Sequence, residues 1–271
     1  MQFDQIGPWS EVKLEILRKY VGAYSRILAK QPGLSHVYVD AFSGAGVHVA
    51  KRTGQSVVGS PLRALEVTPP FREYYFIDLN PGKIEVLRTA VGSRSDVHIY
   101  AGDCNKILLK EIFPLIRRDP RCRGLCFLDP YGLHLRWEVI ESAGQSGTIE
   151  IFLNFPIADM NRNALRRAPE RVTPAQRERM NAFWGDRSWE PAAYDRSGNF
   201  FGWAERTDNR TVVAAFGKRL ESVAGFSYVP DPLPMRNSKR SEVYYLFFAS
   251  PNRTGAKIVS DIFRRYRDRA R

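Results

Sequence analysis

Hydrophobic and polar positions along this chain alternate between two periodicities. Residues 9–30 carry apolar side chains at near-helical spacing, and Ser10 stands where it would cap that helix. Pro32 and Gly33 then end the helix. Beyond them, short uninterrupted apolar runs alternate with stretches of helical spacing. This pattern predicts strands at 36–42, 74–80, 97–103, 124–132 and 148–156, and helices at 60–67, 81–91, 104–118 and 136–144.

Nearly every predicted strand is an uninterrupted apolar run. Such strands are typical of a sheet whose two faces are both covered by helices. Repeated strand–helix units of this length favour a right-handed, doubly wound, mostly parallel sheet. Ser60 is predicted to cap the helix that has Pro61 at its first position, and Asn80-Pro81 opens the next helix.

The pattern changes after Pro156. Residues 157–210 are polar, basic and interrupted by prolines, and we predict a basic, aromatic-rich helical insert that includes a helix at 174–184. Residues 211–271 return to the first domain with a helix, two antiparallel edge strands and a last basic helix. We therefore expect three segments, 1–156, 157–210 and 211–271, and an α/β fold with a seven-stranded sheet.

Composition limits the classes of protein that need to be considered. With 44% hydrophobic and 26% charged residues and no long apolar run, the chain of 271 residues is typical of a soluble globular protein with no membrane segment. Its first residues do not have the form of a secretory signal. Cys104, Cys122 and Cys126 have neither disulfide-framework nor metal-site spacing, which favours a reduced, cytoplasmic setting. The histidines form no ligand spacing, so we assign no metal.

Positive charge is concentrated in the second part of the chain. The net charge is +12, and residues 157–271 hold 22 Lys and Arg against 13 Asp and Glu, whereas residues 1–156 hold 19 against 16. Clustered cations raise the local concentration of phosphates and so indicate an anionic partner. A merely basic, solvated surface explains the same numbers, and charge alone leaves both interpretations open.

An acidic residue follows each of the first four predicted strands. These residues are Asp40, Asp78, Asp103 and Asp129. In a doubly wound sheet, ligands bind beyond the carboxyl ends of the strands. Gly44 and Gly46 follow the first of these acids and would let the backbone approach a ligand closely. Asp is also a common helix cap, which is the structural alternative at each position.

Several nucleotide-binding motifs do not match the loop after the first strand. A dinucleotide loop would need Gly where Val49 stands, a P-loop would need Gly at Ala50 before Lys51, and a nucleophile elbow would need Gly at Ala41. S-adenosylmethionine (SAM) matches better, because its amine and sulfonium are cationic and favour carboxylates and carbonyls.

Three of the four acids can each be assigned to a different part of the SAM molecule. We predict that Asp40 and its loop bind the methionine end, that Asp78 binds the ribose hydroxyls, and that Asp103 accepts the adenine amino group.

The motifs VDAFSGAG, GSPLRAL, YFID, AGDCN, FLDPYG and EIFLNFP, in this order, resemble those of the three-Cys-motif partner (TcmP) proteins. The resemblance covers residues 9–156 well. It implies a methyltransferase-like fold and a partner protein similar to radical-SAM enzymes. The segment D-x-F-x-G-x-G is similar to the cofactor loop of class I SAM-dependent methyltransferases. The cofactor-binding residues that we predict on this basis are Asp40, Phe42, Gly44, Gly46, Asp78, Asp103 and Cys104.

Asp129-Pro130-Tyr131-Gly132 lies where amino-directed nucleic-acid methyltransferases have an Asp/Asn-Pro-Pro-aromatic tetrad. By that resemblance Asp129 and the Pro130 carbonyl accept an exocyclic N–H, and Tyr131 stacks on the base. The second proline is missing, and Asp-Pro-aromatic-Gly is closer to the tetrad of tRNA guanine-N2 dimethyltransferases, which favours RNA over DNA. The alternative is a plain type I turn, for which Pro at the second position and Gly at the fourth are suited.

Further candidates for substrate contact follow the fifth strand. We predict that Asn154 lines the substrate side and that Arg162, Arg166 and Arg167 contact phosphates. The basic insert also offers Arg171, Arg177 and Arg179 as phosphate contacts, and Trp184, Trp189 and Trp203 either as stacking surfaces or, as is more common for tryptophan, as buried packing.

Two functional hypotheses follow. The first is a cytoplasmic SAM-dependent methyltransferase that acts on nucleic acid and works with a radical-SAM-like three-Cys-motif partner. The second is a catalytically silent module with a methyltransferase fold that binds SAM, or nothing, and acts as a scaffold for a partner protein.

Overall fold

The central sheet positions every candidate residue. The computed structural model describes residues 3–195 and 205–267, and within them this sheet has seven strands in the order β11-β12-β8-β7-β2-β5-β6. Strands β6, β5, β2, β7 and β8 are parallel, and β12 is antiparallel to both of its neighbours. The sheet strands are β2 (Ser35–Asp40), β5 (Glu73–Asp78), β6 (Val97–Ala101), β7 (Cys122–Leu128), β8 (Ile149–Phe155), β11 (Leu233–Arg236) and β12 (Glu242–Ala249).

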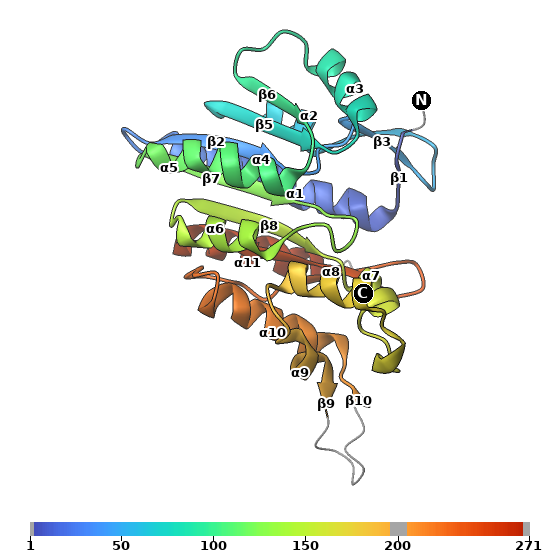
Figure 1. The fold of residues 1–271 in the computed structure, drawn as a ribbon. Coiled ribbons are helices and arrows are strands. Elements are labelled where there is room, and N and C mark those ends of the chain that lie inside the picture. Colours follow the sequence, from blue (N-terminus) through green and yellow to red (C-terminus); the bar gives the residue numbers. More distant parts are fainter. Residues whose placement is uncertain (1–2, 196–204, 268–271) are drawn as a thin grey trace.

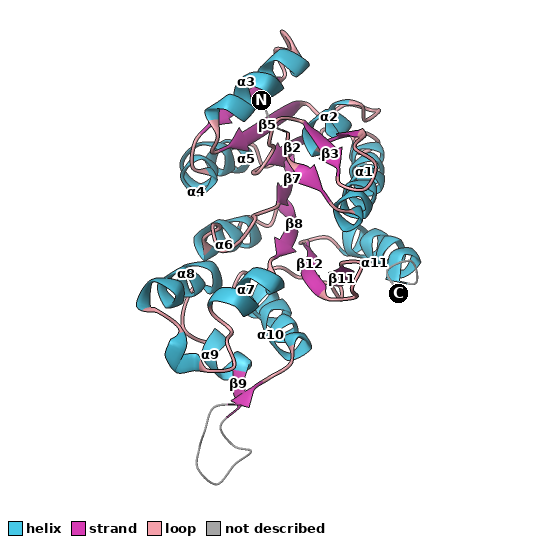
Figure 2. Cartoon of the chain, turned by 90° about the vertical axis from the view of Figure 1, so that its right-hand side faces the viewer, coloured by secondary structure: helices cyan, strands magenta, loops and turns pink. Residues whose placement is uncertain are grey.

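Helices cover both faces of this sheet (Figure 2). On one face α1 and α11 lie side by side, and on the other α4, α5 and α6 follow one another, as Figure 1 also shows. The helices named so far are α1 (Pro8–Leu28), α4 (Cys104–Ile107), α5 (Phe113–Arg118), α6 (Trp137–Gln145) and α11 (Arg253–Arg267). The predicted doubly wound α/β fold with a seven-stranded, mostly parallel sheet is therefore confirmed.

Each face has its own hydrophobic core. Phe76, Phe127 and Phe152 point to the side of α1 and α11, where Tyr20 packs edge-on against Phe152 with 5.2 Å between ring centroids. On the opposite side the core extends beyond the sheet to Phe216. Fully burying one such side chain contributes roughly 1.5–3 kcal/mol. Besides α4, α5 and α6, the helices that contribute to this second core are α7 (Ile157–Asn163), α8 (Pro174–Trp184), α9 (Trp189–Ala193) and α10 (Asn209–Ser222).

The segment after Pro156 packs on the same core as the sheet. The helix predicted at 174–184 is α8, and Thr173 caps it with a capping box that involves Gln176. Two short strands, β9 (Tyr194–Asp195) and β10 (Glu205–Arg206), pair before α10. The short helix η2 (Pro169–Arg171) precedes α8. The division into three segments stays a prediction.

Two predicted helix caps were wrong. Helix α1 begins at Pro8 with Gly7 as its N-cap, so Ser10 lies inside the helix. Helix α2 (Ser60–Leu65) likewise has Gly59 as its N-cap, so Ser60 is the first residue of the helix and not its cap. In both cases the N-cap glycine has an extended backbone and a proline stands at the first or second position of the helix, so the helix begins without a side-chain cap. Asn80 does cap α3 (Pro81–Val91), as predicted, and accepts from the Gly82 and Lys83 amides.

Other elements of the first half were not predicted. In the described part, β1 (Gln5–Ile6), β3 (Val47–Ala50) and β4 (Ser56–Val58) form a small sheet of three strands, in which β1 pairs with β3 in parallel. The helix predicted at 104–118 contains a π-helical segment, η1 (Leu108–Ile112), just before Pro114, which has no N–H to donate.

Candidate functional site

The four strand-end acids lie at one edge of the sheet. Asp40 and Asp78 are the last residues of β2 and β5, and Asp129 directly follows β7. Asp103 comes two residues after β6 and is the N-cap of α4. Because parallel strands end at the same edge, these carboxylates belong to the edge where doubly wound sheets bind ligands.

The glycine loop after β2 is held against the next strand. Gly44 has φ +61° and Gly46 has φ +77°, conformations that favour glycine. The Gly44 amide donates to Asp78 Oδ2 at 3.0 Å, and the Ser43 hydroxyl donates to the Ile77 carbonyl at 3.1 Å. A Cβ added to Gly44 would meet no atom closer than 4.0 Å, so the loop backbone faces open space at this position.

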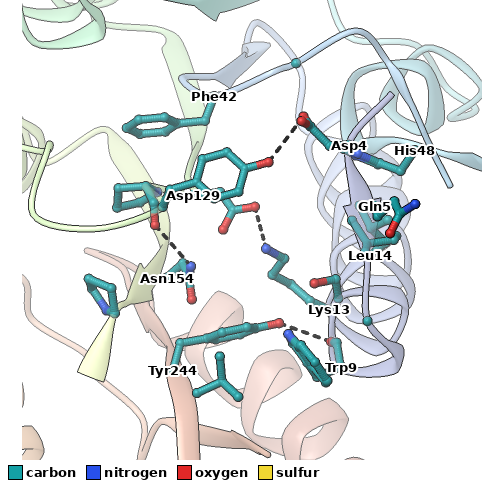
Figure 3. A pocket seen from close by; sticks show the side chains of 18 of the residues that line it. Asp4, Gln5, Trp9, Lys13, Leu14, Phe42, His48, Asp129, Asn154 and Tyr244 are labelled. Atoms are coloured by element: carbon teal, nitrogen blue, oxygen red, sulfur yellow. Dashed lines mark hydrogen bonds and ion pairs between the residues drawn. The ribbon is translucent and has the colours of Figure 1, made fainter. Parts of the chain in front are cut away.

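One cavity joins the glycine loop to residues 129–132, which we call the Asp129 turn (Figure 3). Its volume is about 250 Å³. The residues of the sequence prediction that line it come from β2–α3 on one side and β7–α7 on the other, and they are Phe42, Gly44, Asp78, Asp129, Pro130, Tyr131, Asn154 and Arg162. Candidate cofactor and substrate residues therefore share a single space.

Asp40 lies beneath this cavity and does not line it. Its side chain is fully buried, Oδ1 accepts the Phe42 amide at 3.2 Å, and Oδ2 has no hydrogen-bond partner among the described residues. Burial raises the pKa of Asp40 to about 7, against the opposing effects of the Ser60 hydroxyl and the Phe42 amide. A buried acceptor without a partner beside a cavity is one that a cationic ligand group would satisfy.

Asp129 forms an ion pair with Lys13, a residue that the sequence analysis did not select. Lys13 Nζ bonds Asp129 Oδ2, and the two side chains are 8% and 24% exposed. The ammonium also lies 5.1 Å from the centre of the Tyr244 ring and 5.7 Å from that of Phe127. In Figure 3 Lys13 reaches from α1 toward Asp129 at the centre of the cavity. The predicted acceptor carboxylate is thus already bound by a cation.

The N-terminal segment closes one side of the cavity. Asp4 Oδ2 pairs with Lys83 Nζ at 2.5 Å and accepts from the Tyr131 hydroxyl at 3.3 Å. Lys83 also lies 5.9 Å from the centre of the Tyr131 ring. Desolvation of the hydroxyl group, together with the charges of Asp4 and Asp129, raises the pKa of Tyr131 although its ring faces solvent. Tyr131 is therefore held at the rim as a neutral phenol whose ring remains largely exposed.

Asn154 supports the Asp129 turn from the neighbouring strand. Its Nδ2 donates to the Pro130 carbonyl at 3.3 Å, and its Oδ1 has no partner among the described residues. Gly132 allows the turn to pass close to α7, because a Cβ there would lie 2.8 Å from Asp159 Oδ2. The backbone of the turn is thus fixed on both sides.

The remaining predicted cofactor residues lie outside the cavity wall. Asp103 Oδ1 accepts the Asn105 amide at 3.0 Å and the Asn105 side chain at 2.9 Å, as a helix cap does. Burial raises the pKa of Cys104 to about 12, so this thiol is neutral. A Cβ on Gly46 would lie 2.8 Å from Leu87, so this glycine serves close packing of the loop. Contact of these residues with a cofactor stays a prediction.

The basic residues after β8 are separated by the structure. Arg162 lines the cavity and lies 3.7 Å from Asp159, whereas Arg166 donates to the Arg162 carbonyl at 3.1 Å and, like the exposed Arg167, does not line it. Arg177 pairs with Glu190 at 2.8 Å. The exposed Arg171 and Arg179 also lie outside the cavity wall.

Two of the tryptophans are packing residues. Trp184 and Trp189 are each 1% exposed, and their indole N–H groups donate to Ser188 and Asn181. Of the two alternatives, buried packing is therefore confirmed for them and the stacking role was wrong. Trp203 lies outside the described residues.

Sequence reasoning missed most of the cavity's N-terminal wall. Trp9, Lys13 and His48 line it together with Asp4 and Tyr244. One signal was available: Lys13 stands four residues before Leu17 and so continues the buried stripe of the first helix, where a charge needs a partner. Burial lowers the pKa of His48, whose Nδ1 has no partner in the described part of the chain.

Neither a metal centre nor a membrane-spanning helix is found in the part of the chain that the structure describes. Among residues 3–195 and 205–267, no cluster of three or more His, Cys, Asp or Glu is arranged to hold a metal ion. In the same ranges no helix combines the length and apolar character that crossing a membrane requires.

Comparisons with known proteins show the fold. No protein-family model and no curated protein matches the sequence. Protein LPL1258 from Legionella pneumophila str. Philadelphia 1, of family DUF519, is similar in structure, with a TM-score of 0.53, 12% identity, and coverage of 93% of this chain and 92% of its own. At this identity the likeness establishes a shared fold.

More distant structural likenesses include named methyltransferases. N-methyltransferase NodS from Bradyrhizobium japonicum WM9, in complex with S-adenosyl-L-homocysteine (SAH), has a TM-score of 0.39 and 11% identity, covering 91% of this chain and 89% of its own. The methyltransferase domain of bacterial CtHen1-CN has a TM-score of 0.40 and 10% identity, covering 88% and 99%. Both likenesses are too weak to bear on the activity of this chain.

Proposed function

We propose that this protein is a SAM-dependent methyltransferase that acts on an exocyclic amine of a nucleic-acid base, with RNA favoured over DNA. The observation that supports this most is the single cavity, which the glycine loop and Asp78 line on one side and Asp129, Pro130 and Asn154 on the other. A cofactor held by the first group would present its reactive end to a substrate held by the second.

The residues on the cofactor side have the chemistry that SAM requires. Asp40 Oδ2 is a buried acceptor without a partner, suited to the ammonium of the methionine end. Asp78 is half-buried at the end of β5, where the ribose hydroxyls of a nucleoside would lie. Gly44 has no side chain to block the space above the loop. When bound, SAM supplies a methyl group on a positively charged sulfur, which is already a good electrophile.

The residues on the substrate side would orient an amine. Asp129 and the Pro130 carbonyl are hydrogen-bond acceptors for its N–H groups, and Asn154 fixes the Pro130 carbonyl in place. Tyr131 offers an exposed ring at the rim on which an extruded base could stack. The protein's main contribution would be in-line alignment, since methyl transfer needs little acid–base catalysis.

The wider setting follows from the sequence resemblance. A member of the TcmP family would work in the cytoplasm together with a radical-SAM-like protein that carries a three-Cys motif. The motifs that support this lie within residues 36–156. Co-purification from the native host, followed by mass spectrometry of bound protein and nucleic acid, would identify both partners. Recovery of the chain without either would count against this setting.

Calorimetry with SAM and SAH is the first test of the cofactor. We expect both to bind, and Asp40→Ala and Asp78→Ala to abolish binding, because under this proposal both carboxylates bind the same ligand. Gly217→Ala in α10 is a matched control, since a Cβ there meets only Phe247 at an ordinary 3.5 Å. Absence of SAM binding by the intact protein would exclude the enzyme.

Transfer of labelled methyl groups from SAM to bulk tRNA tests the acceptor side. Asp129→Asn should lower incorporation while the SAM affinity holds, because Asp129 contacts the acceptor and not the cofactor loop. Unchanged incorporation would exclude the role given to the Asp129 turn.

One observation favours the silent scaffold as an alternative. The Lys13 ammonium occupies Asp129, the acceptor that a substrate amine would need. If SAM binds but no nucleic acid or protein from the native host is methylated, and Lys13→Met does not restore transfer, the scaffold explains the chain better.

A further inference from the structure

Another cavity opens at the opposite edge of the sheet. It lies at the amino ends of β2 and β5 and has a volume of about 250 Å³. Its lining residues are Val37, Arg72, Glu73, Tyr75, His98, Leu115 and Ile116. Residues 117–123 run from the last residues of α5 into the start of β7 and contain four arginines, and we call them the arginine turn. Arg72 links this turn to the cavity.

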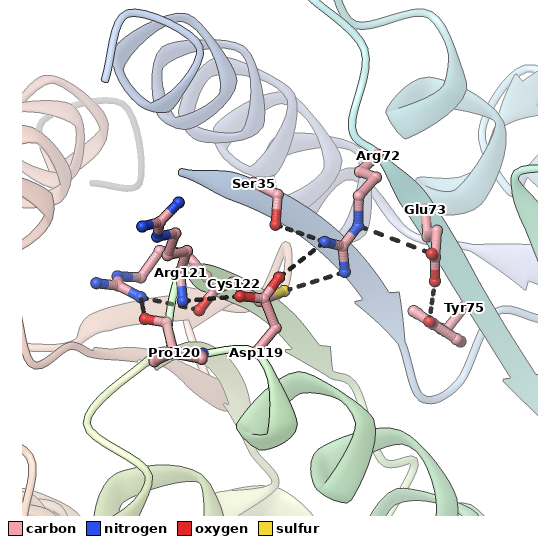
Figure 4. A network of polar contacts seen from close by, with 9 residues as sticks. Ser35, Arg72, Glu73, Tyr75, Asp119, Pro120, Arg121 and Cys122 are labelled. Atoms are coloured by element: carbon pink, nitrogen blue, oxygen red, sulfur yellow. Dashed lines mark hydrogen bonds and ion pairs between the residues drawn. The ribbon is translucent and has the colours of Figure 1, made fainter. Parts of the chain in front are cut away.

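The arginine turn is held in a fixed shape (Figure 4). Arg72 donates to Asp119 Oδ2 at 3.0 Å and to the Ser35 hydroxyl at 2.7 Å. The Arg121 amide donates to Asp119 Oδ1 at 2.9 Å. Arg123 donates to the Pro120 carbonyl at 2.8 Å. The single carboxylate of the turn is thus bound internally, and Figure 4 shows the Arg121 side chain on the side of Asp119 away from Arg72.

Several guanidinium groups of the turn remain free for a partner. Arg117, Arg118 and Arg121 are exposed. Among the described residues none of these three forms an ion pair, so their charge is not neutralised within the described chain. Planar guanidinium groups bind phosphate oxygens in pairs, and a turn of fixed shape loses little entropy when it does so.

The adjoining cavity offers an aromatic surface. His98 stacks on Tyr75 with 4.9 Å between ring centroids and 20° between ring planes, and the His98 side chain is 41% exposed. Glu73 lies beside this pair, 3.7 Å from His98 Nε2. Its carboxylate accepts from the Tyr75 hydroxyl and lies 3.7 Å from Arg72, and its remaining lone pairs can accept from an amino group. Unpaired RNA bases are recognised by stacking on such rings and by hydrogen bonds to their edges.

We propose that this cavity and the arginine turn bind one unpaired nucleotide of an RNA, with its base on His98 and the neighbouring phosphates on Arg117, Arg118 and Arg121. The inference rests on the proposed function, because it takes RNA as the partner. Arg121 and Asp129 stand directly before and after β7, eight residues apart, which corresponds to about 26 Å in a strand. An RNA that reaches both sites must span that distance, so a short oligonucleotide would lose one of them.

Fluorescence anisotropy with a labelled single-stranded RNA of about 20 nucleotides tests the phosphate contacts without any need for methyl transfer. The variant Arg117→Gln/Arg118→Gln/Arg121→Gln should bind at least tenfold more weakly. The slope of log affinity against log salt should also fall by about 2, since each lost phosphate contact in single strands contributes ~0.7.

A matched control removes as much charge from the other face of the sheet. Helix α11 lies on that face (Figure 2). Its Arg253, Lys257 and Arg265 are exposed, and the control is Arg253→Gln/Lys257→Gln/Arg265→Gln. We expect less than a twofold change in affinity for this control. An equal loss in both triple variants would overturn the proposal, because it would show only the effect of net charge.

His98→Ala separates stacking from charge. It should weaken binding of the RNA about fivefold or more, and it should leave binding of heparin, a polyanion without bases, unchanged. Equal effects on both probes, or none on the RNA, would overturn the base subsite. SAM binding measured on the same variants should equal that of the unchanged protein. Loss of RNA binding here is thus distinguished from failure of the proposed methyltransferase, which the SAM and Asp129→Asn experiments decide.

Discussion

The substitution Asp40→Asn tests the environment of the buried acid beneath the cavity. Burial raises the pKa of this carboxyl from 3.8 to about 7, and its Oδ2 has no hydrogen-bond partner in the described chain. Asparagine has nearly the same shape and cannot ionise. The variant therefore removes the titration and leaves the packing of the glycine loop in place.

The size of the effect follows from proton binding. Between pH 4 and pH 7 the folded protein keeps a proton on Asp40 that the unfolded chain has released, so unfolding releases a proton and stability falls as the pH rises. One pKa unit corresponds to ~1.36 kcal/mol, so the unchanged protein should lose about 2–3 kcal/mol between pH 5 and pH 7 through this group. Asp40→Asn should not show that loss.

Urea unfolding of both proteins at several pH values between 5 and 8 measures this loss of stability. The free energy of unfolding of Asp40→Asn, relative to that of the unchanged protein, should rise by about 2–3 kcal/mol over this range. Glu150, whose pKa burial also raises to about 7, titrates in both proteins and cancels in the difference. A difference that stays constant with pH would refute the burial and protonation state that we assign to Asp40.

Three further substitutions test the site and the core. Lys13→Met should lower the free energy of unfolding by about 2 kcal/mol in urea titrations. This is less than the roughly 3–5 kcal/mol lost when a fully buried ion pair is broken, because the partner carboxylate of Asp129 is about a quarter exposed. An unchanged free energy of unfolding would show that the ion pair is not formed. Gly59→Ala should weaken SAM binding about tenfold in calorimetry, whereas Gly217→Ala should not, because only the first places a Cβ 2.8 Å from a backbone oxygen, that of Gly46. Trp184→Ala should lower the free energy of unfolding by about 3–5 kcal/mol, and a loss below 1 kcal/mol would mean that its side chain is not buried.

The fold was largely predictable because its parallel strands can be recognised from the sequence pattern alone. The parallel strands are mostly apolar runs, the first four end in or near an acid, and each of those four is followed by helical spacing. Such a repeated unit has very few topologies open to it. Two strands of the small sheet, β1 and β4, were beyond prediction because their two or three residues are too short for any periodicity to show.

The site was predictable only where its residues follow strands. Asp78 and Asp129 were found because the sheet fixes where a strand end must lie. Lys13, Asp4 and Tyr244 reach the cavity from α1, the N-terminal segment and the antiparallel strand β12, and their positions depend on how distant segments pack. Trp184 was considered as a possible stacking surface and is in fact buried, because the sequence alone does not distinguish an interior indole from a surface one.

The wall that begins at Asp4 has a practical consequence for anyone who purifies this protein. Asp4 and Gln5 form part of the cavity only a few residues from the start of the chain, and Asp4 is bonded to Lys83 and Tyr131. Removing these residues, or joining another sequence directly to them, would disturb the wall of the opening. Assays on a protein altered there would report on a changed cavity.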